Sequence, residues 1–185
     1  MNERNDLGSA QRPLVYILTG NIHSGKTTFL QSVCAVLKQK GMRLSGLLSR
    51  SLYSGDKIRG YDGYDLADET VFPLARILTK QGDLRCGRFV FLSHGLEKAR
   101  RALLKPGKFD WTVVDEMGPL ELDRRGFWSP VAELLHRRRD LLLVIRRPLL
   151  ADFIHILPPP DMIFDMSRPD LSKTIVETLL KKQLR

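Results

Sequence analysis

The sequence of 185 residues predicts an α/β protein built on a doubly wound, mostly parallel sheet. Short apolar runs alternate with segments whose apolar residues recur at helical spacing, the order expected for parallel strands joined by crossover helices. The first strand-to-helix connection carries a glycine-rich phosphate loop at residues 20–27. A hydrophobic content of 43% suffices for an ordinary core. We therefore expect one domain over residues 13–185, preceded by a disordered tail over residues 1–12.

The first half of the chain predicts one βα unit followed by antiparallel strands. The apolar run 14–18 predicts a strand, and helical spacing after the loop predicts a helix that begins near Lys26 and ends at Gly41. A further strand is expected at 43–50. Between residues 44 and 78, short apolar runs alternate with turn signals at 54–56 and 62–63. This pattern predicts a β-meander or hairpins inserted after the first βα unit.

The second half predicts four strands and four helices. The strands are expected at 89–92, 111–114, 141–145 and 162–164. The helices are expected at 95–104, 130–138, 148–156 and from about 170 to 182, with a rigid break at the prolines 158–160. Ser93 is predicted to cap the first of these helices, and Ser167 with Asp170 to form a capping box for the last.

Composition limits the possible partners and compartments. The net charge of +9 permits nucleic-acid binding, but the basic residues are widely spread and no aromatic residues interleave with them, so this role is not favoured. No run of 18 apolar residues or signal peptide is present, and Cys34 and Cys86 form neither a disulfide framework nor a metal spacing. We expect a cytoplasmic protein without a membrane contact. The oligomeric state is open, with a monomer favoured.

The phosphate loop matches the pattern G-x-x-x-x-G-K-T and has the strand and helix context that this pattern needs. Its backbone N–H groups and the N-terminus of the following helix are predicted to hold phosphate oxygens. Lys26 is expected to reach the β- and γ-phosphates, and the Thr27 hydroxyl to bind Mg²⁺. The predicted nucleotide-binding residues are Gly20, Asn21, Ile22, His23, Ser24, Gly25, Lys26, Thr27 and Thr28.

Two consecutive carboxylates follow the buried strand at 111–114. A phosphate loop needs a partner carboxylate at the end of such a strand to hold Mg²⁺, and Asp115 has this position. Glu116, one residue further on, can orient or deprotonate a water that attacks the γ-phosphate. The pair Asp115-Glu116 therefore favours hydrolysis over simple phosphate binding.

The loop at 20–27, taken with the segment V-V-D-E-M-G-P-L-E-L at 113–122, resembles the cancer-related nucleoside-triphosphatase family, which has thermophile members. The second signature of that family is roughly D-E-I-G-P-M-E-L, and the resemblance makes Glu121 a structural or site-organising acid. Gly60-Tyr61-Asp62 and Gly87-Arg88-Phe89 resemble two further family elements. The segment 46–52, in contrast, lacks the acidic residue of the corresponding family element.

The resemblance implies a P-loop NTPase fold of the RecA and AAA type, in which the strand of the metal aspartate is not adjacent to the strand of the loop. It also implies slow, Mg²⁺-dependent hydrolysis of ATP, GTP and other nucleoside triphosphates to the diphosphate and phosphate. Two alternatives stay open: a nucleotide or small-molecule kinase, and a slow nucleotide-dependent switch acting on a protein or RNA partner.

A further cation is expected to offset charge on the γ-phosphate. The stronger candidates are Arg59, Arg88 and Arg146, the last because it follows the strand 141–145; Arg147 and Lys57 are weaker. Tyr61 or Phe127 could stack on a nucleobase, although packing is the commoner fate of both.

Overall fold

The computed structural model describes residues 12–77 and 84–181. The tail expected at residues 1–12 falls outside these ranges except for Arg12, whose guanidinium lies 2.7 Å from Asp161 in an ion pair. Among the helices within the described ranges, none is long and apolar enough to cross a membrane.

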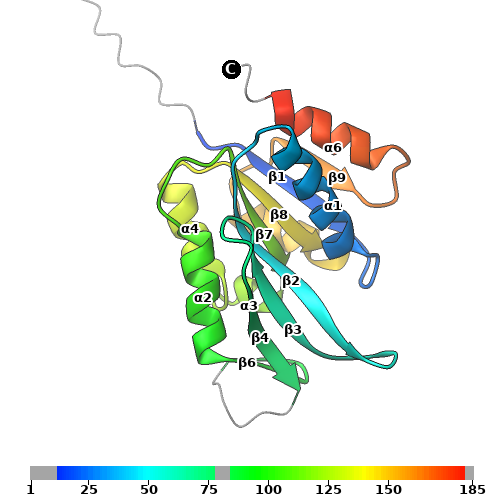
Figure 1. Cartoon of the computed structure of the whole chain (residues 1–185). Helices are drawn as coiled ribbons and strands as arrows, with labels where there is room; N and C mark the ends of the chain where they lie inside the picture. The colour runs from blue at the N-terminus through cyan, green and yellow to red at the C-terminus, as the bar shows by residue number, and fades with distance from the viewer. Residues whose placement is uncertain (1–11, 78–83, 182–185) are drawn as a thin grey trace, which may run out of the picture.

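Nine strands in the described ranges form one sheet, in the order β5-β6-β4-β3-β2-β7-β8-β1-β9 (Figure 1). The strands are β1 (Val15–Gly20), β2 (Leu44–Ser54), β3 (Lys57–Asp65), β4 (Val71–Ile77), β5 (Leu84–Cys86), β6 (Phe89–Phe91), β7 (Trp111–Met117), β8 (Leu141–Arg146) and β9 (Met162–Asp165). The helices are α1 (Lys26–Gln39), α2 (Ser93–Leu103), α3 (Pro119–Leu122), α4 (Trp128–His136), the 3₁₀ turn η1 (Arg147–Leu149), α5 (Leu150–Ile156) and α6 (Leu171–Leu180).

The sheet is mixed and has a parallel half and an antiparallel half. Strands β9, β1, β8, β7 and β2 run parallel, whereas β3, β4, β6 and β5 extend the β2 edge in antiparallel fashion. The inserted hairpin region expected between residues 44 and 78 is therefore confirmed. Strand β8 separates β1 from β7, so the loop strand and the strand of Asp115 are not adjacent, as the family resemblance implied.

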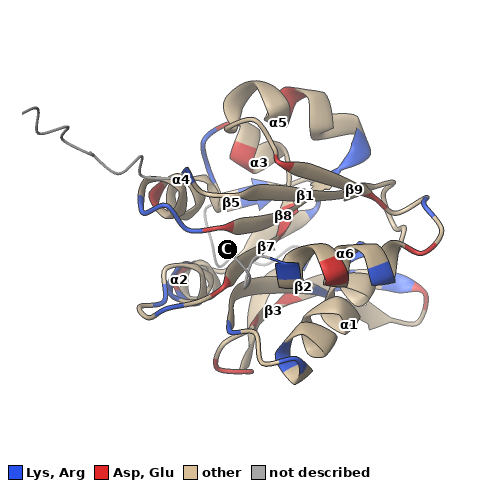
Figure 2. Cartoon of the chain, turned by 90° about the horizontal axis from the view of Figure 1, so that it is seen from above, with Lys and Arg blue, Asp and Glu red and all other residues tan. Residues whose placement is uncertain are grey.

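The strand residues alternate between two helical layers because successive side chains in a strand point to opposite faces. Helices α1 and α6 cover one face, and α2, α4 and α5 cover the other (Figures 1 and 2). In β8, Leu142 and Val144 pack towards α1 and α6, whereas Leu141, Leu143 and Ile145 pack towards the opposite layer. Because β9, β1, β8, β7 and β2 run parallel, their carboxyl ends lie along one edge of the sheet.

Two local predictions, a turn at residues 62–63 and a helix cap at Ser93, were wrong. Asp62 and Gly63 form no turn but lie inside β3, where the chain crosses a bulge in its pairing with β4. Ser93 is the first residue of α2, and no side-chain cap bond precedes that helix.

The predicted capping box at α6 is also absent. Asp170 has left-handed backbone angles, with φ 58°, and makes no side-chain cap bond. Ser167 instead donates from its backbone N–H and its hydroxyl to Asp165, at 2.9 and 2.8 Å. Ser167 therefore stabilises a local turn after β9 and does not cap α6. Strand β5 and helix α3 were not predicted, since both are too short to show a period.

Candidate functional site

The phosphate loop connects β1 to α1 and is held open by left-handed backbone at His23 and Gly25, with φ 61° and 77°. The Lys26 side chain turns back over the loop, where its ammonium donates to the carbonyls of Asn21 at 2.6 Å and Gly20 at 3.3 Å. Lys26 is only 6% exposed. Burial lowers the pKa of Lys26, and the nearby Glu116 acts in the opposite direction. The loop thus holds a desolvated cation at its centre.

Asp115 is fully buried at the point where β7 meets the loop. Its Oδ2 accepts a hydrogen bond from the Thr27 hydroxyl at 2.8 Å and another from the Ser49 backbone N–H at 3.0 Å. Its Oδ1 is buried and has no hydrogen-bond partner among the described residues. Burial raises the pKa of Asp115 to about 7, and the adjacent Glu116 adds to the rise.

This donor set fits Mg²⁺. The ion prefers oxygen ligands and is commonly bound by one or two carboxylates together with substrate phosphates and water. Thr27 offers a hydroxyl and Asp115 offers a buried carboxylate with one unused oxygen, and the two side chains already touch. Within the described ranges no group of three or more His, Cys, Asp or Glu residues is arranged to hold a metal ion, so a metal here would depend on the substrate for its remaining ligands.

Glu116 and Arg146 form an ion pair beside Asp115. The Oε2 of Glu116 lies 2.6 Å from Nη2 of Arg146, and each side chain is 29% exposed. Burial acts to lower the pKa of Arg146, but Glu116 outweighs it and raises the pKa above the ordinary value. Glu116 has left-handed backbone, with φ 71°, at an irregularity in the pairing of β7 with β8.

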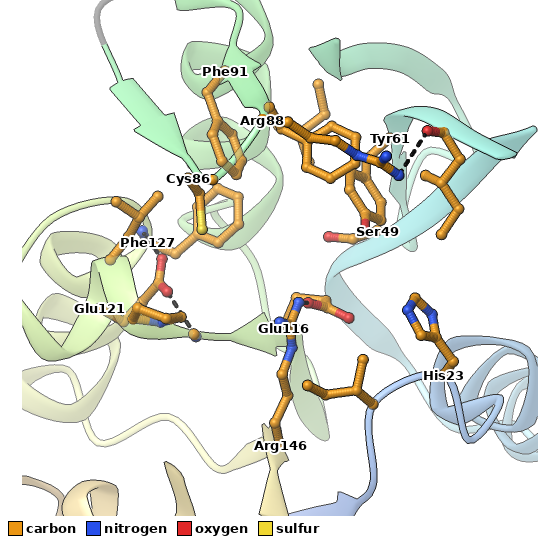
Figure 3. A pocket seen from close by; sticks show the side chains of 18 residues that line it. His23, Ser49, Tyr61, Cys86, Arg88, Phe91, Glu116, Glu121, Phe127 and Arg146 are labelled. Atoms are coloured by element: carbon orange, nitrogen blue, oxygen red, sulfur yellow. Dashed lines mark hydrogen bonds and ion pairs between the residues drawn. The ribbon is translucent and has the colours of Figure 1, made fainter. Parts of the chain in front are cut away.

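Two cavities meet at this ion pair. The loop cavity, of about 330 Å³, is bounded by residues 22–28 of the phosphate loop together with Arg50, Ser51 and Tyr53. The second cavity, which we call the side chamber, has a volume of about 310 Å³ and is lined in part by residues of strands β3 to β6. Figure 3 shows the side chains around it. Both cavities are lined by Ile22, His23, Tyr61, Glu116 and Arg146.

The structure separates the cations proposed from the sequence. Arg146 lines both cavities, whereas Arg88 lines only the side chamber, where it donates to the Ile58 carbonyl at 3.2 Å. Arg59 and Lys57 are exposed and line neither cavity. Arg147 pairs with Asp165 at 2.5 Å and likewise lines neither. Arg146 is thus the cation that the fold brings next to both Lys26 and Glu116.

Of the two aromatic residues considered for base stacking, Tyr61 borders both cavities, with its ring 4.9 Å from that of Phe89. Phe127 is buried and borders only the side chamber. Gly20 is buried and lines neither cavity, because it ends β1 beneath the loop. His23 is exposed on the loop.

Glu121 organises the turn that follows β7. It is 3% exposed, and its two carboxylate oxygens accept from the backbone N–H groups of Gly118 and Phe127, each at 2.8 Å. Burial raises the pKa of Glu121, while these two hydrogen bonds act to lower it. The side chain therefore ties both ends of the segment 118–127 together, next to the side chamber.

Comparison with known proteins assigns the family. A family model described as NTPase matches residues 15–162, which is most of the chain. The chain belongs to this NTPase family. The resemblance to the cancer-related nucleoside-triphosphatases is thereby confirmed, and so is the expectation of a nucleoside-triphosphate hydrolase.

Relatives of this family member include a nucleoside-triphosphatase THEP1 of Methanopyrus kandleri, 28% identical over 89% of this chain and 94% of the relative. A cancer-related nucleoside-triphosphatase homolog of Bos taurus is 30% identical over 64% of this chain and 67% of the relative. The solution structure of a human cancer-related nucleoside triphosphatase superposes with a TM-score of 0.68, at 23% identity, over 94% of this chain and 98% of the other. This likeness confirms the P-loop NTPase fold.

Several site residues were not found from the sequence. Ser49 and Arg50 lie in β2 next to Asp115 and the loop cavity, but nothing in their local pattern marks them. Cys86 and Phe91 line the side chamber from β5 and β6. Only the register of the antiparallel half of the sheet brings Cys86 and Phe91 to the side chamber.

Proposed function

We propose that this NTPase family member hydrolyses nucleoside triphosphates, ATP and GTP among them, to the diphosphate and phosphate in a Mg²⁺-dependent reaction. The single observation that carries this proposal is the contact of Thr27 with Asp115, whose second carboxylate oxygen is buried and unused among the described residues. A buried carboxylate oxygen without a hydrogen bond is costly, and a bound cation removes that cost.

In this proposal Lys26 and the loop N–H groups hold the β- and γ-phosphates, and Thr27 and Asp115 hold the metal. When bound, Mg²⁺ neutralises charge on the β- and γ-phosphate oxygens. Glu116 lies one residue beyond Asp115, at the border of the loop cavity, where it can orient a water towards the γ-phosphate. Arg146, held by Glu116 at 2.6 Å, can then stabilise charge on the transferred group.

The names of the relatives support the same reaction, since both the archaeal and the bovine relatives are nucleoside-triphosphatases. A nucleotide-dependent switch has no comparable support from a particular contact in the described part of the chain. Lys and Arg residues are spread over several helices and loops in Figure 2 rather than gathered on one element.

The test is phosphate release from ATP, GTP, CTP and UTP, each with Mg²⁺ and with EDTA. Lys26→Ala is expected to lose nucleotide binding and turnover, because it removes the cation facing the phosphates. Glu116→Gln is expected to retain binding and to lose about 10²-fold or more in turnover, since only water activation is removed. Glu177→Gln, an exposed change on α6, is the matched control. Full turnover in EDTA or in Lys26→Ala would overturn the proposal.

A further inference from the structure

The side chamber has the lining of a small-molecule site rather than of a phosphate site. Its far wall is apolar and aromatic, as Figure 3 shows for Cys86, Phe91 and Phe127. Ile58, Leu74 and Leu120 add further apolar side chains to the lining. A volume of about 310 Å³ is at the lower end of the range for ligand pockets, which are mostly apolar with a few placed polar groups.

The end of the chamber that faces the loop cavity is polar. Glu116 and Arg146 lie there, as members of both linings. Ser49 is 5% exposed, and its hydroxyl has no hydrogen-bond partner among the described residues. Figure 3 shows its side chain directed into the pocket between Tyr61 and Glu116. A buried hydroxyl left unpaired in this way is a place where a polar group of a ligand would be stabilised.

The two cavities share a border, and this border determines what a molecule in the chamber can do. A ligand whose apolar body fills the far wall has its polar end at Ser49 and Glu116. On the other side of Glu116 lies the cavity of Lys26 and Thr27, where the γ-phosphate is proposed to bind. The polar end of the ligand would therefore be a neighbour of the transferred group.

We propose that the side chamber binds a small neutral alcohol with an aromatic or aliphatic body, and that this alcohol accepts the γ-phosphoryl group. The inference rests on the proposed nucleoside-triphosphate site. A neutral ligand is favoured over an anionic one because most of the lining is apolar and because Arg146, at the polar end, already pairs with Glu116.

The transfer step needs no reagent beyond the two substrates. The alcohol oxygen attacks the γ-phosphorus and forms an O–P bond, while the bond from that phosphorus to the β–γ bridging oxygen breaks. The bridging electron pair leaves with the nucleoside diphosphate. The proton of the alcohol passes to the Glu116 carboxylate and then to solvent. With the chamber empty, water takes the place of the alcohol, so hydrolysis and transfer share one site.

The experiment uses 2-phenylethanol as the probe, added to the full chain with ATP and Mg²⁺. Binding is followed by NMR through the labelled methyl groups of Leu74 and Leu120. Products are followed by ³¹P NMR, which separates phosphate from the phosphate monoester. A dissociation constant of roughly millimolar is expected for so small a ligand. Phosphate release without the probe is recorded in parallel, so that loss of the proposed hydrolysis is seen separately from loss of transfer.

Cys86→Phe is designed to fill the far end of the chamber, and Cys86→Ser is its matched control at nearly unchanged size. Cys86 borders the chamber but not the loop cavity, so hydrolysis is expected to stay within about twofold of wild type. Probe binding and ester formation are expected to fall at least about tenfold in Cys86→Phe only. Ile58→Phe, at another apolar position of the lining, repeats the test should the first variant not fold.

We expect saturable shifts of the methyl signals on addition of 2-phenylethanol. The phosphate monoester should form in wild type and in Cys86→Ser, and should be lost in the variants that fill the chamber. Methyl shifts without any ester would overturn the acceptor role and leave only a binding site. Unshifted methyl groups would overturn the site itself. Ester formation that survives in both filled variants would place the acceptor elsewhere.

Discussion

Replacement of Asp115 by Asn is expected to stabilise the metal-free protein and to abolish its activity. Asp115 is fully buried, and burial raises its pKa to about 7. A carboxyl whose pKa is raised on folding favours the folded state below the unfolded pKa, and this contribution is lost as the pH rises through the folded pKa. Above pH 7 the metal-free wild type therefore carries an ionised carboxylate in a buried site, whereas the Asp115→Asn variant carries a neutral amide there.

The magnitude follows from the pKa and the contacts. The gap between the pKa of about 7 and the ordinary value of 3.8 corresponds to about 4 kcal/mol at pH 8. Asn keeps an acceptor oxygen for the Thr27 hydroxyl and the Ser49 N–H but places an amide donor at the unpartnered Oδ1 position. An unpaired buried donor costs about 1–3 kcal/mol. The net gain is therefore about 1–3 kcal/mol, or several degrees in Tm for a domain of this size.

The assay is thermal and urea unfolding of both proteins in EDTA between pH 5 and 8. Because the other ionisable groups titrate alike in both proteins, the difference between their free energies of unfolding reports on Asp115. This difference should shrink by about 2–3 kcal/mol from pH 8 to pH 5. Asp56→Asn, an exposed change in the turn between β2 and β3, is the control and should show no such trend. Adding Mg²⁺ with ATP should stabilise wild type and not the Asp115→Asn variant.

Two results would refute this reasoning. If Asp115→Asn were less stable than wild type at pH 8, the carboxylate would be neutral or already compensated in the metal-free protein. A stability difference that did not change with pH would mean that the substitution acts through packing and not through charge.

Three further outcomes are expected. Glu121→Ala should destabilise the fold by about 2–4 kcal/mol, measured by urea unfolding, because two buried backbone N–H groups lose their acceptor; a change below about 1 kcal/mol would contradict the structural role. Gly46→Ala should cost at least about 3 kcal/mol or prevent folding, since φ is +114° and an added Cβ would lie 2.0 Å from the Val113 carbonyl oxygen; a soluble variant with an unchanged Tm would show that this strand pair can relax. Arg146→Ala should lower phosphate release roughly 10²-fold or more while nucleotide binding changes little, and wild-type turnover would remove Arg146 from the mechanism.

Much of the fold and half of the site follow from local sequence. The phosphate loop is continuous in the chain, and Asp115 ends a buried apolar run, so a motif and a period are enough to find Lys26, Thr27 and Asp115. The first inserted hairpin was also predictable, because the turn signal at 54–56 lies between two short apolar runs. These features depend on neighbours along the chain.

The rest depends on neighbours in space. The side chamber is lined from β2, β3, β4, β5, β6 and the turn after β7, and its residues have ordinary identities for a core. The unused hydroxyl of Ser49 is visible only once β2 lies beside β7. The absence of the predicted capping box has a similar cause. Ser167 hydrogen-bonds to Asp165 and not to the start of α6, and the sequence pattern alone does not show which partner it takes.

The bulge in β7 explains how two consecutive carboxylates can serve one site. In a regular strand, residues 115 and 116 would point to opposite faces of the sheet. Here Val114 and Met117 both pack into the layer of α2, α4 and α5, although two residues separate them rather than one. The extra residue is accommodated at Glu116, whose φ of 71° costs about 1–2 kcal/mol for a side chain other than glycine. Such strain persists where the surrounding structure holds it, and in this chain it turns Glu116 to the border of both cavities, against Arg146, while Asp115 stays buried beside Thr27.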